Sequence, residues 1–205
     1  MAVISFTYGP LENNSYIVHN GKDAVIIDPS TDTEDMLDFI STAGLKLHAL
    51  LLTHMHFDHV PGCAAMMKAT GLPVYAGAED ISMAAVHFAG ARMFGLPPVK
   101  PFDATKLKPA RYTWGALECE VIHAPGHSEG SLCYYFPQEK ALVSGDVLFY
   151  HSVGRTDFAG GDAEKLLHTL HDKLLKLPPE TVVWPGHGPE TSISDEAAHN
   201  PYCRV

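Results

Sequence analysis

Thr-His-Met-His-Phe-Asp-His, at residues 53–59, is the stretch of this sequence that decides the fold. It follows a run of three leucines, which has the character of a strand leaving a core. Alternate residues of an extended chain point the same way, so His54, His56 and Asp58 share one side. His59 can reach in from the next turn, whereas on a helix His56 would point away from its neighbours. The spacing therefore predicts a metal site on a loop after a strand, with ligands that suit zinc or iron.

Three further segments repeat this pattern of a short β-rich run, a glycine turn and then one histidine or aspartate. They end in Pro125-Gly126-His127, Ser144-Gly145-Asp146 and Pro185-Gly186-His187. Open sheets tend to place their sites at the ends of strands, so we expect the four strand ends to present ligands at a common edge. One histidine after a strand means little, but four such units in one chain indicate a metal centre.

Composition bounds the class of protein. The chain has 205 residues, 46% hydrophobic and 19% charged, which is ordinary for a globular protein of one domain or at most two small ones. A net charge of −10 without a basic run argues against nucleic acid or an anionic membrane as partner. No apolar stretch reaches membrane-spanning length and no signal pattern opens the chain, so we expect a cytoplasmic protein. The four cysteines show no C-x-x-C pairing and are expected to be free thiols.

Strands come first in the sequence and then alternate with helices, which predicts layered α/β architecture with helices outside packed sheets. Three short strands are expected within the first 28 residues, and Leu47–Leu52 is expected to be a buried strand. Between them, a helix should begin near Asp32, with Thr31 or Asp32 as its cap.

The C-terminal half carries a second clear helix signal and one irregular segment. Asp162 is expected to cap an amphipathic helix that runs through Leu177. The proline-rich segment Leu96–Lys108 is expected to be a loop without regular structure. The apolar face of the predicted helix consists of Leu166, Leu167, Leu170 and Leu174.

These motifs resemble the metallo-β-lactamase superfamily and, within it, the glyoxalase II group, the hydroxyacylglutathione hydrolases. The likeness runs through nearly the whole chain, and five blocks match in order and spacing. The blocks are T-H-x-H-x-D-H at Thr53–His59, P-G-H-S at Pro125–Ser128, S-G-D at Ser144–Asp146, G-R-T-D at Gly154–Asp157 and P-G-H-G at Pro185–Gly188. The resemblance implies an α/β fold of the αββα type, in which two mixed β-sheets pack face to face with helices outside.

The resemblance also implies a centre of two divalent metal ions, with zinc as the first choice and iron or manganese as alternatives. The first ion would be held by His54, His56 and His127, the second by Asp58, His59 and His187, and both by the bridging Asp146. A hydroxide between the two ions would then attack an acyl carbon. Asp58 and Asp146 are the implied catalytic carboxylates.

The implied activity is hydrolysis of a small-molecule thioester, S-lactoylglutathione or a related acyl-thiol. Full-length glyoxalase II proteins carry a helical C-terminal domain that supplies part of the glutathione pocket. Only seventeen residues follow Gly188 in this sequence, so we expect one domain over residues 1–205 without that addition. The sequence is silent on oligomeric state. Substrate contacts are expected from Arg155, Tyr150, His151 and His199.

Two other functions stay open. Persulfide dioxygenases use iron and share the G-R-T-D-F block at Gly154–Phe158, but they tend to have P-A-H-D where this chain has Pro185–Gly188. A metal-binding protein without turnover is the third hypothesis. Arg155 has an alternative structural role as the ion-pair partner of Asp157. Asp28 is expected to hydrogen-bond a loop under the metal site and not to bind metal.

Overall fold

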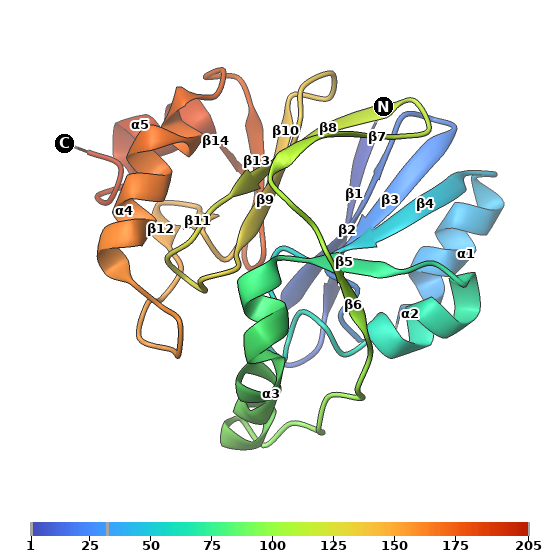
Figure 1. Ribbon diagram of the computed structural model, residues 1–205. Coiled ribbons are helices and arrows are strands. Elements are labelled where there is room, and N and C mark those ends of the chain that lie inside the picture. The colour runs from blue at the N-terminus through green and yellow to red at the C-terminus, as the bar shows by residue number, and fades with distance from the viewer. Residues whose placement is uncertain (1, 32, 205) are drawn as a thin grey trace.

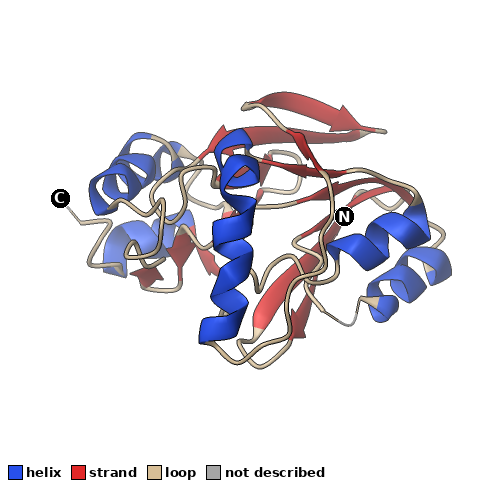
Figure 2. Cartoon of the chain, turned by 60° about the horizontal axis from the view of Figure 1, so that its bottom comes forward, coloured by secondary structure: helices blue, strands red, loops and turns tan. Residues whose placement is uncertain are grey.

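A computed structural model of the chain describes residues 2–31 and 33–204. Its strands form two six-stranded sheets and a two-stranded ribbon. Figure 1 shows the two sheets stacked in the middle of the molecule, with helices on both outer sides. Figure 2 shows the same layers from below, with α3 crossing in front of the strands.

The N-terminal half of the chain builds the first sheet, in the order β1-β2-β3-β4-β5-β6. β1 to β3 pair antiparallel, whereas β3 to β6 pair parallel, so the sheet is mixed. The strands are β1 Ala2–Tyr8, β2 Asn13–His19, β3 Asp23–Ile27, β4 Lys46–Leu51, β5 Val74–Ala76 and β6 Ala104–Lys106.

The C-terminal half builds the second sheet, in the order β14-β13-β10-β9-β8-β7. β10 and β13 pair parallel and the other neighbours pair antiparallel, so this sheet is mixed too. The strands are β7 Ala110–Trp114, β8 Leu117–His123, β9 Leu132–Phe136, β10 Ala141–Gly145, β13 Val182–Pro185 and β14 Thr191–Ser192. The ribbon consists of β11 Leu148–Phe149 and β12 Ser152–Val153.

The helices cover the outer faces of the sheets (Figure 1). In the part of the chain that the structure describes, no helix is long and apolar enough to cross a membrane. The helices are α1 Glu34–Thr42, α2 Cys63–Thr70, α3 Ala78–Met93, α4 Ala163–Asp172 and α5 Ile193–His199, with a 3₁₀ turn at Leu174–Lys176.

Alternation along the strands divides the core into layers. Val25 and Leu51 belong to the cluster between the sheets, whereas Ile26 and Leu50 pack with α1 and α2 on the outer face. The second sheet does the same, because Tyr134 faces the first sheet while its neighbours on β9 pack against α4. Successive strand residues point to opposite faces, so this register buries both faces of each sheet. The expected αββα arrangement of two mixed sheets is confirmed.

Each of the two predicted helices needs a correction at one boundary, α1 at its start and α4 at its end. Thr33 precedes the first turn of α1 without a side-chain capping bond, so the cap is not Thr31, and Asp32 lies outside the described residues. Asp162 caps α4 as predicted, by accepting hydrogen bonds from two backbone N–H groups of the first turn. However, α4 ends at Asp172 and a 3₁₀ turn continues to Lys176. Leu167 is also 40% exposed, so it lies outside the apolar face.

The segment Leu96–Lys108 is not wholly irregular, because β6 forms within it and extends the first sheet by pairing with β5. The composition of this segment does not predict a strand. The strand β6 forms because it can pair with β5 at the edge of the sheet. α5 was not predicted either. Its seven residues lack an apolar stripe, and its first turn depends on Ser192, whose hydroxyl accepts a hydrogen bond from the Asp195 N–H.

Candidate metal centre

Four loops meet where β4, β8, β10 and β13 end. They bring together all seven side chains that the motifs singled out, although these residues span more than half of the chain. The expectation that the strand ends share one edge is met for this set. The seven residues are His54, His56, Asp58, His59, His127, Asp146 and His187.

The first group consists of His54, His56 and His127, whose ligand atoms lie within 4.8 Å of one another. Nδ1 of His56 lies 2.8 Å from Nε2 of His127. All three rings are buried. Three converging imidazoles can hold one divalent ion.

The second group consists of Asp58, His59 and His187, again with ligand atoms within 4.8 Å. Oδ2 of Asp58 lies 3.4 Å from Nε2 of His187 and 3.8 Å from Nε2 of His59. His187 is partly exposed, so this group is the more open of the two. It can hold a second ion beside the first.

Asp146 lies between the two groups. Its Oδ2 is 3.6 Å from Nε2 of His127 in the first group and 3.6 Å from Nε2 of His187 in the second. Its Oδ1 is 3.4 Å from Nε2 of His59. One carboxylate therefore faces both candidate ion positions.

Hydrogen bonds fix the outer nitrogens of three of the rings. Nδ1 of His127 donates to the Arg155 carbonyl at 2.8 Å, and Nδ1 of His187 donates to the Leu11 carbonyl at 2.9 Å. Nδ1 of His54 lies 3.0 Å from the Thr53 hydroxyl. Each bond selects the tautomer in which Nε2 carries the free lone pair toward the cluster, as in many metal-binding histidines.

Asp28 supports the same loop from below. Its carboxylate accepts hydrogen bonds from the Thr53 N–H at 2.7 Å, from the Thr53 hydroxyl at 2.6 Å and from Nδ1 of His59 at 3.1 Å. Both carboxylate oxygens are thus engaged by the loop. The hydrogen bonds predicted for Asp28 are confirmed, whereas its exclusion from the metal ligands stays a prediction, because Asp28, His54 and His59 also form a group that could hold an ion.

The sequence reading missed Asp80, in the first turn of α3. This buried carboxylate accepts hydrogen bonds from the Met55 N–H, the Ser128 hydroxyl and the Gly130 N–H, at 2.7–2.9 Å. It joins α3 to the loops that carry the first group. An acidic residue in the first turn of a helix usually serves the helix dipole on the surface, so the pattern gave no signal for this role.

Burial and charge act in opposite directions on the two groups. Burial, together with the neighbouring His127, lowers the pKa of His56 to about 3. Burial also lowers the pKa of His54 well below its usual value. At His59, burial is outweighed by Asp146 and Asp58, so its pKa is raised. His54 and His56 are therefore neutral, whereas His59 tends to hold a proton in the absence of metal.

The donor atoms fit divalent metal ions. Nε2 of His54 and Nε2 of His56 are buried without a hydrogen-bond partner among the described residues. A buried polar atom left unpaired costs about 1–3 kcal/mol, and two in one cluster would be a large penalty. Coordination to a cation satisfies them. The same imidazole and carboxylate set suits zinc, iron or manganese.

Two glycines next to the cluster are required by its close packing. A Cβ on Gly186 would lie 2.1 Å from Oδ1 of Asp146, and a Cβ on Gly154 would lie 1.8 Å from the Asp146 carbonyl oxygen. Any side chain at either position would displace the central aspartate. Close packing against Asp146 therefore explains why the P-G-H motif has glycine at residue 186 and the G-R-T motif has glycine at residue 154.

Two cavities border the cluster, and Phe57 lines both. One, of about 280 Å³, has Asp58, Leu11 and Lys100 in its wall. The other, of about 420 Å³, has His56 in its wall together with apolar side chains such as Phe158. Each group of candidate ligands thus faces its own space for part of a substrate.

The four predicted substrate contacts are not in the walls of these two cavities. The Arg155 guanidinium binds the Asp157 carboxylate at 2.6 Å and lies over the Phe158 ring at 4.0 Å. Tyr150 stacks on His151, whose Nε2 lies 2.7 Å from Asp195. His199 lies beside the same aspartate. None of these side chains lines the two cavities that border the cluster.

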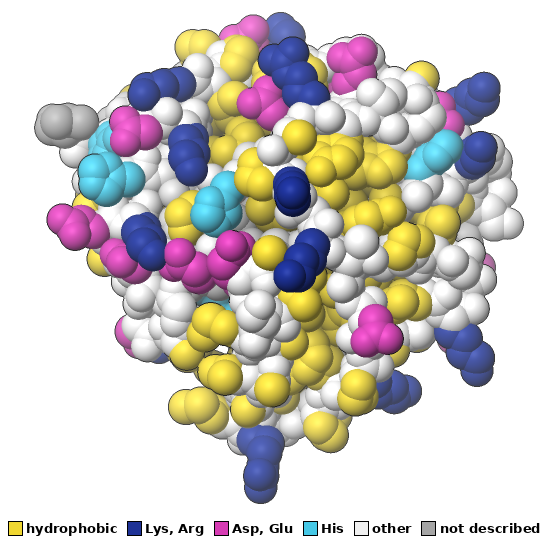
Figure 3. All heavy atoms as spheres, in the orientation of Figure 1, with side chains coloured by type: hydrophobic (Ala, Val, Ile, Leu, Met, Phe, Trp, Pro, Cys, Tyr) yellow, Lys and Arg dark blue, Asp and Glu magenta, His cyan; other side chains and the backbone are white. Residues whose placement is uncertain are grey.

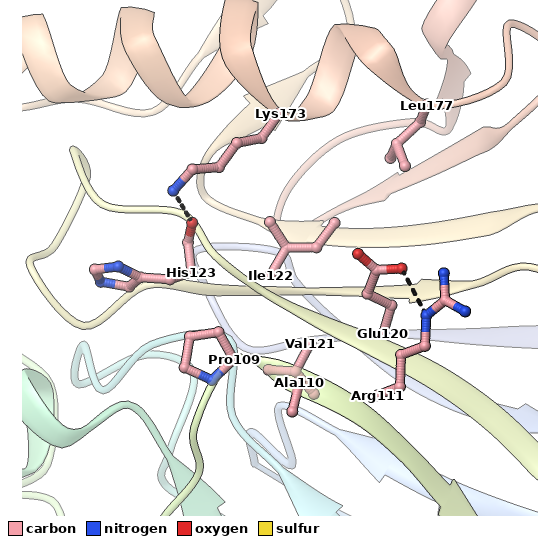
Figure 4. Close-up of a pocket in the computed structure, with 9 residues that line it drawn as sticks. All are labelled: Pro109, Ala110, Arg111, Glu120, Val121, Ile122, His123, Lys173 and Leu177. Carbon is pink, nitrogen blue, oxygen red and sulfur yellow. Dashed lines mark hydrogen bonds and ion pairs between the residues drawn. The ribbon is translucent and has the colours of Figure 1, made fainter.

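A further cavity, of about 480 Å³, lies apart from the cluster, between β8 and the C-terminal end of α4. In Figure 4 the Lys173 amine reaches the His123 carbonyl oxygen across it, and Arg111 pairs with Glu120. Its lining contains none of the seven clustered side chains, so this cavity is not part of the candidate metal centre.

Figure 3 shows that Lys and Arg side chains are dispersed over one face of the molecule around a central apolar area.

Comparison with known proteins gives the same picture as the geometry. The chain is 35% identical to the probable metallo-hydrolase YqgX of Bacillus subtilis, over 95% of this chain and 93% of that protein. It is 33% identical to the hydroxyacylglutathione hydrolase GloC of Haemophilus influenzae, over 93% and 92%. Among solved structures, TTHA1623 in a di-iron-bound form has a TM-score of 0.89 and 42% identity, covering 98% of this chain and all of that one.

The sequence profile of the metallo-beta-lactamase superfamily matches residues 8–187, which include every clustered side chain. The fold, the cluster of candidate metal ligands and the related proteins all indicate the same family. The chain is a metal-binding metallo-hydrolase and belongs to the metallo-beta-lactamase superfamily.

Proposed function

We propose that this protein hydrolyses thioesters of small acyl-thiols, with S-lactoylglutathione as the first substrate to test. The observation that carries the proposal is the position of Asp146, whose Oδ2 lies 3.6 Å from a histidine of each ligand group. A carboxylate in that position suits a centre of two ions. Such a centre can clamp both the attacking and the leaving atom of an acyl transfer.

In this proposal the seven clustered side chains hold two divalent ions. Zinc and iron both suit the donors, and the relative that was solved in a di-iron-bound form supports iron. When bound, the ions lower the pKa of water and polarise the acyl carbonyl. The first ion is assigned to His54, His56 and His127, the second to Asp58, His59 and His187, and Asp146 is shared.

Asp58 is the second proposed catalytic carboxylate. Burial raises the pKa of its carboxyl, but His59, His187 and Asn13 lower it more, so the group stays ionised. Nδ2 of Asn13 donates a hydrogen bond to Oδ2 of Asp58 at 2.9 Å and fixes its orientation. An ionised, oriented carboxylate can accept a hydrogen bond from the attacking water and direct its oxygen to the acyl carbon. A C–O bond forms between the water oxygen and the acyl carbon, and the C–S bond breaks. The departing sulfur takes up the proton that the water has lost.

The two cavities beside the cluster can take the two halves of an acyl-thiol. The cavity at His56 has mostly apolar walls, whereas the cavity at Asp58 includes Lys100. Lys100 can bind a carboxylate of a thiol carrier such as glutathione. Arg155 can contribute at the other side, because the Phe158 ring beneath it also contacts His56, with 5.4 Å between the ring centroids. Glutathione is a cytoplasmic thiol, and a cytoplasmic location is part of the proposal.

A second candidate is oxygenation of a persulfide on the same fold. The G-R-T-D-F block at Gly154–Phe158 favours it, and the relative that was solved in a di-iron-bound form supports iron binding by this fold. This reaction needs iron and dioxygen, whereas thioester hydrolysis needs only water. The two candidates can therefore be separated by the metal and by oxygen consumption.

The test uses protein loaded with zinc in one sample and with iron(II) under nitrogen in another. Both are assayed with S-lactoylglutathione, a neutral acyl thioester, an ester, a lactone and glutathione persulfide. We expect thioester hydrolysis with kcat/KM above about 10⁴ M⁻¹s⁻¹. Lys100→Gln should raise KM for the glutathione thioester and leave the neutral thioester unchanged. Oxygen uptake with persulfide alone would favour the second candidate, and metal binding without any turnover would favour a non-catalytic protein.

A further inference from the structure

A second cluster of metal-ligating side chains lies outside the candidate metal centre. It consists of His151, Asp195 and His199, whose ligand atoms all lie within 4.8 Å of one another. Nε2 of His151 is 2.7 Å from Oδ2 of Asp195, and Nδ1 of His199 is 3.0 Å from Oδ1. The proposed hydrolysis uses none of the three.

The backbone holds His151 in place. His151 forms the turn between β11 and β12, and its φ of 52° lies in the left-handed region that residues other than glycine, asparagine and aspartate rarely adopt. The buried carboxylate of Glu196 accepts a hydrogen bond from the His151 N–H at 3.0–3.1 Å. Glu196 is itself fixed by the Thr191 hydroxyl and by Nδ2 of Asn200. The imidazole of His151 is thus presented to α5 before any ligand binds.

α5 supplies the other two side chains. Asp195 and His199 are four residues apart, so they lie on the same face of the helix. A hydrogen bond from His151 is the main reason that the pKa of the Asp195 carboxyl is lowered. The carboxylate therefore stays charged, and all three side chains are partly exposed, so an ion can reach them from solvent.

We propose that His151, Asp195 and His199 form a second metal site, which takes one divalent cation of the zinc class and fastens the β11–β12 turn to α5. Two imidazoles and a carboxylate are a common zinc ligand set, and water can complete the tetrahedron. Figure 1 shows the ribbon and α5 on the same side of the molecule, near the C-terminus. The site does not depend on the proposed hydrolysis.

The position of this site connects it to the candidate metal centre through the chain. β11 begins two residues after Asp146, and α5 begins six residues after His187. The Phe149 ring of β11 lies 6.2 Å from the His187 ring. An ion that joins the turn to α5 would therefore hold together the two segments that follow these side chains.

The alternative is a hydrogen-bonded trio that needs no ion. A control separates the two, because His168 and Asp172 form a histidine–aspartate i,i+4 pair on α4 in the reverse order, with Nδ1 of His168 3.5 Å from Oδ2 of Asp172. Within the described residues, no third histidine, cysteine or carboxylate joins that pair in a ligand group. His168→Ala should therefore leave zinc binding unchanged.

The experiment titrates metal-free, tag-free protein with zinc by calorimetry and follows the histidine side chains by NMR. His151→Asn removes the imidazole but keeps a residue that tolerates the left-handed backbone. We expect His151→Asn and His199→Ala each to bind one equivalent fewer than the unaltered protein, or to bind it at least about 100-fold more weakly. The NMR signals of His151 and His199 should shift with that equivalent.

The readout is a difference of one equivalent, so it holds whatever number of ions the candidate metal centre takes. Equal zinc stoichiometry and affinity in the unaltered protein and both variants would overturn the proposal. So would the same loss in His168→Ala, which would show binding to surface histidines in general. An unchanged thermal midpoint of the metal-free variants would show that the lost equivalent does not reflect unfolding.

Discussion

At the scale of single residues, the central aspartate depends on what surrounds it. Gly186 precedes a candidate ligand and leaves room for Asp146, because a Cβ there would lie 2.1 Å from Oδ1. Gly188 is the matched comparison: a Cβ on it meets nothing within 4 Å, although its φ of 76° makes a side chain strained.

Gly186→Ala should therefore misplace Asp146 without unfolding the protein. A displacement of about 1 Å at a reacting group can reduce kcat/KM by roughly 100-fold. Steady-state kinetics and the thermal midpoint, measured together, check this. A Gly186→Ala enzyme with unchanged kinetics, or a Gly188→Ala enzyme with the larger kinetic loss, would contradict the steric argument.

The two ligand groups should also differ in their response to pH. The pKa of His59 and of His187 is raised, so metal must displace protons from the second group, and this competition grows as the pH falls. The pKa of His54 is lowered and that of His56 is lowered to about 3, so metal meets little competition from protons at these two side chains. In the His151→Asn variant, which lacks the second site proposed above, bound metal should fall from two equivalents to one between pH 8 and about pH 5. Metal analysis after dialysis at each pH checks this, and simultaneous loss of both would contradict it.

At the scale of elements, the sequence predicts what local patterns determine. The β4 strand, the cap of α4 and the loops that carry the motifs follow from alternation, turn residues and polar spacing. β6 and α5 could not be predicted, since their residues carry weak local signals and form these elements through sheet pairing and tertiary contacts. The role of Asp80 was hidden for the same reason, because its partners are far away in the chain.

Asp80 is the strongest test at this scale. Asp80→Ala would leave the N–H groups of Met55 and Gly130 buried without acceptors, at about 1–3 kcal/mol each. The free energy of unfolding should fall by roughly 2–6 kcal/mol, measured by urea denaturation. Glu79→Ala, at the exposed neighbouring position, should cost less than about 1 kcal/mol. Equal effects of the two changes would show that the buried carboxylate does not join the loops.

At the scale of the whole molecule, the candidate metal centre joins the two halves of the chain. Four of its side chains follow β4 of the first sheet, and the other three follow strands of the second sheet. Ions bound there would link the sheets at one end of the shared core. That residues 1–205 form a single domain stays a prediction.

Removing the metal should therefore destabilise the whole fold. A ligand at 1,000 times its dissociation constant contributes about 4 kcal/mol, which is roughly 8–16 °C in the thermal midpoint of a chain of this size. Calorimetry before and after chelation, with zinc restored afterwards, checks the size and the reversibility. An unchanged midpoint after complete loss of metal would mean that the ions do not hold the sheets together.

The most direct test of the central claim is hydrolysis of S-D-lactoylglutathione by zinc-loaded protein, compared with Asp146→Ala and with Asp172→Ala. Asp172 is an exposed carboxylate on α4, and its removal should change nothing. We predict rapid hydrolysis that falls at least about 100-fold in Asp146→Ala, together with the loss of bound metal. Full turnover in Asp146→Ala would contradict the assignment of this carboxylate to both ions.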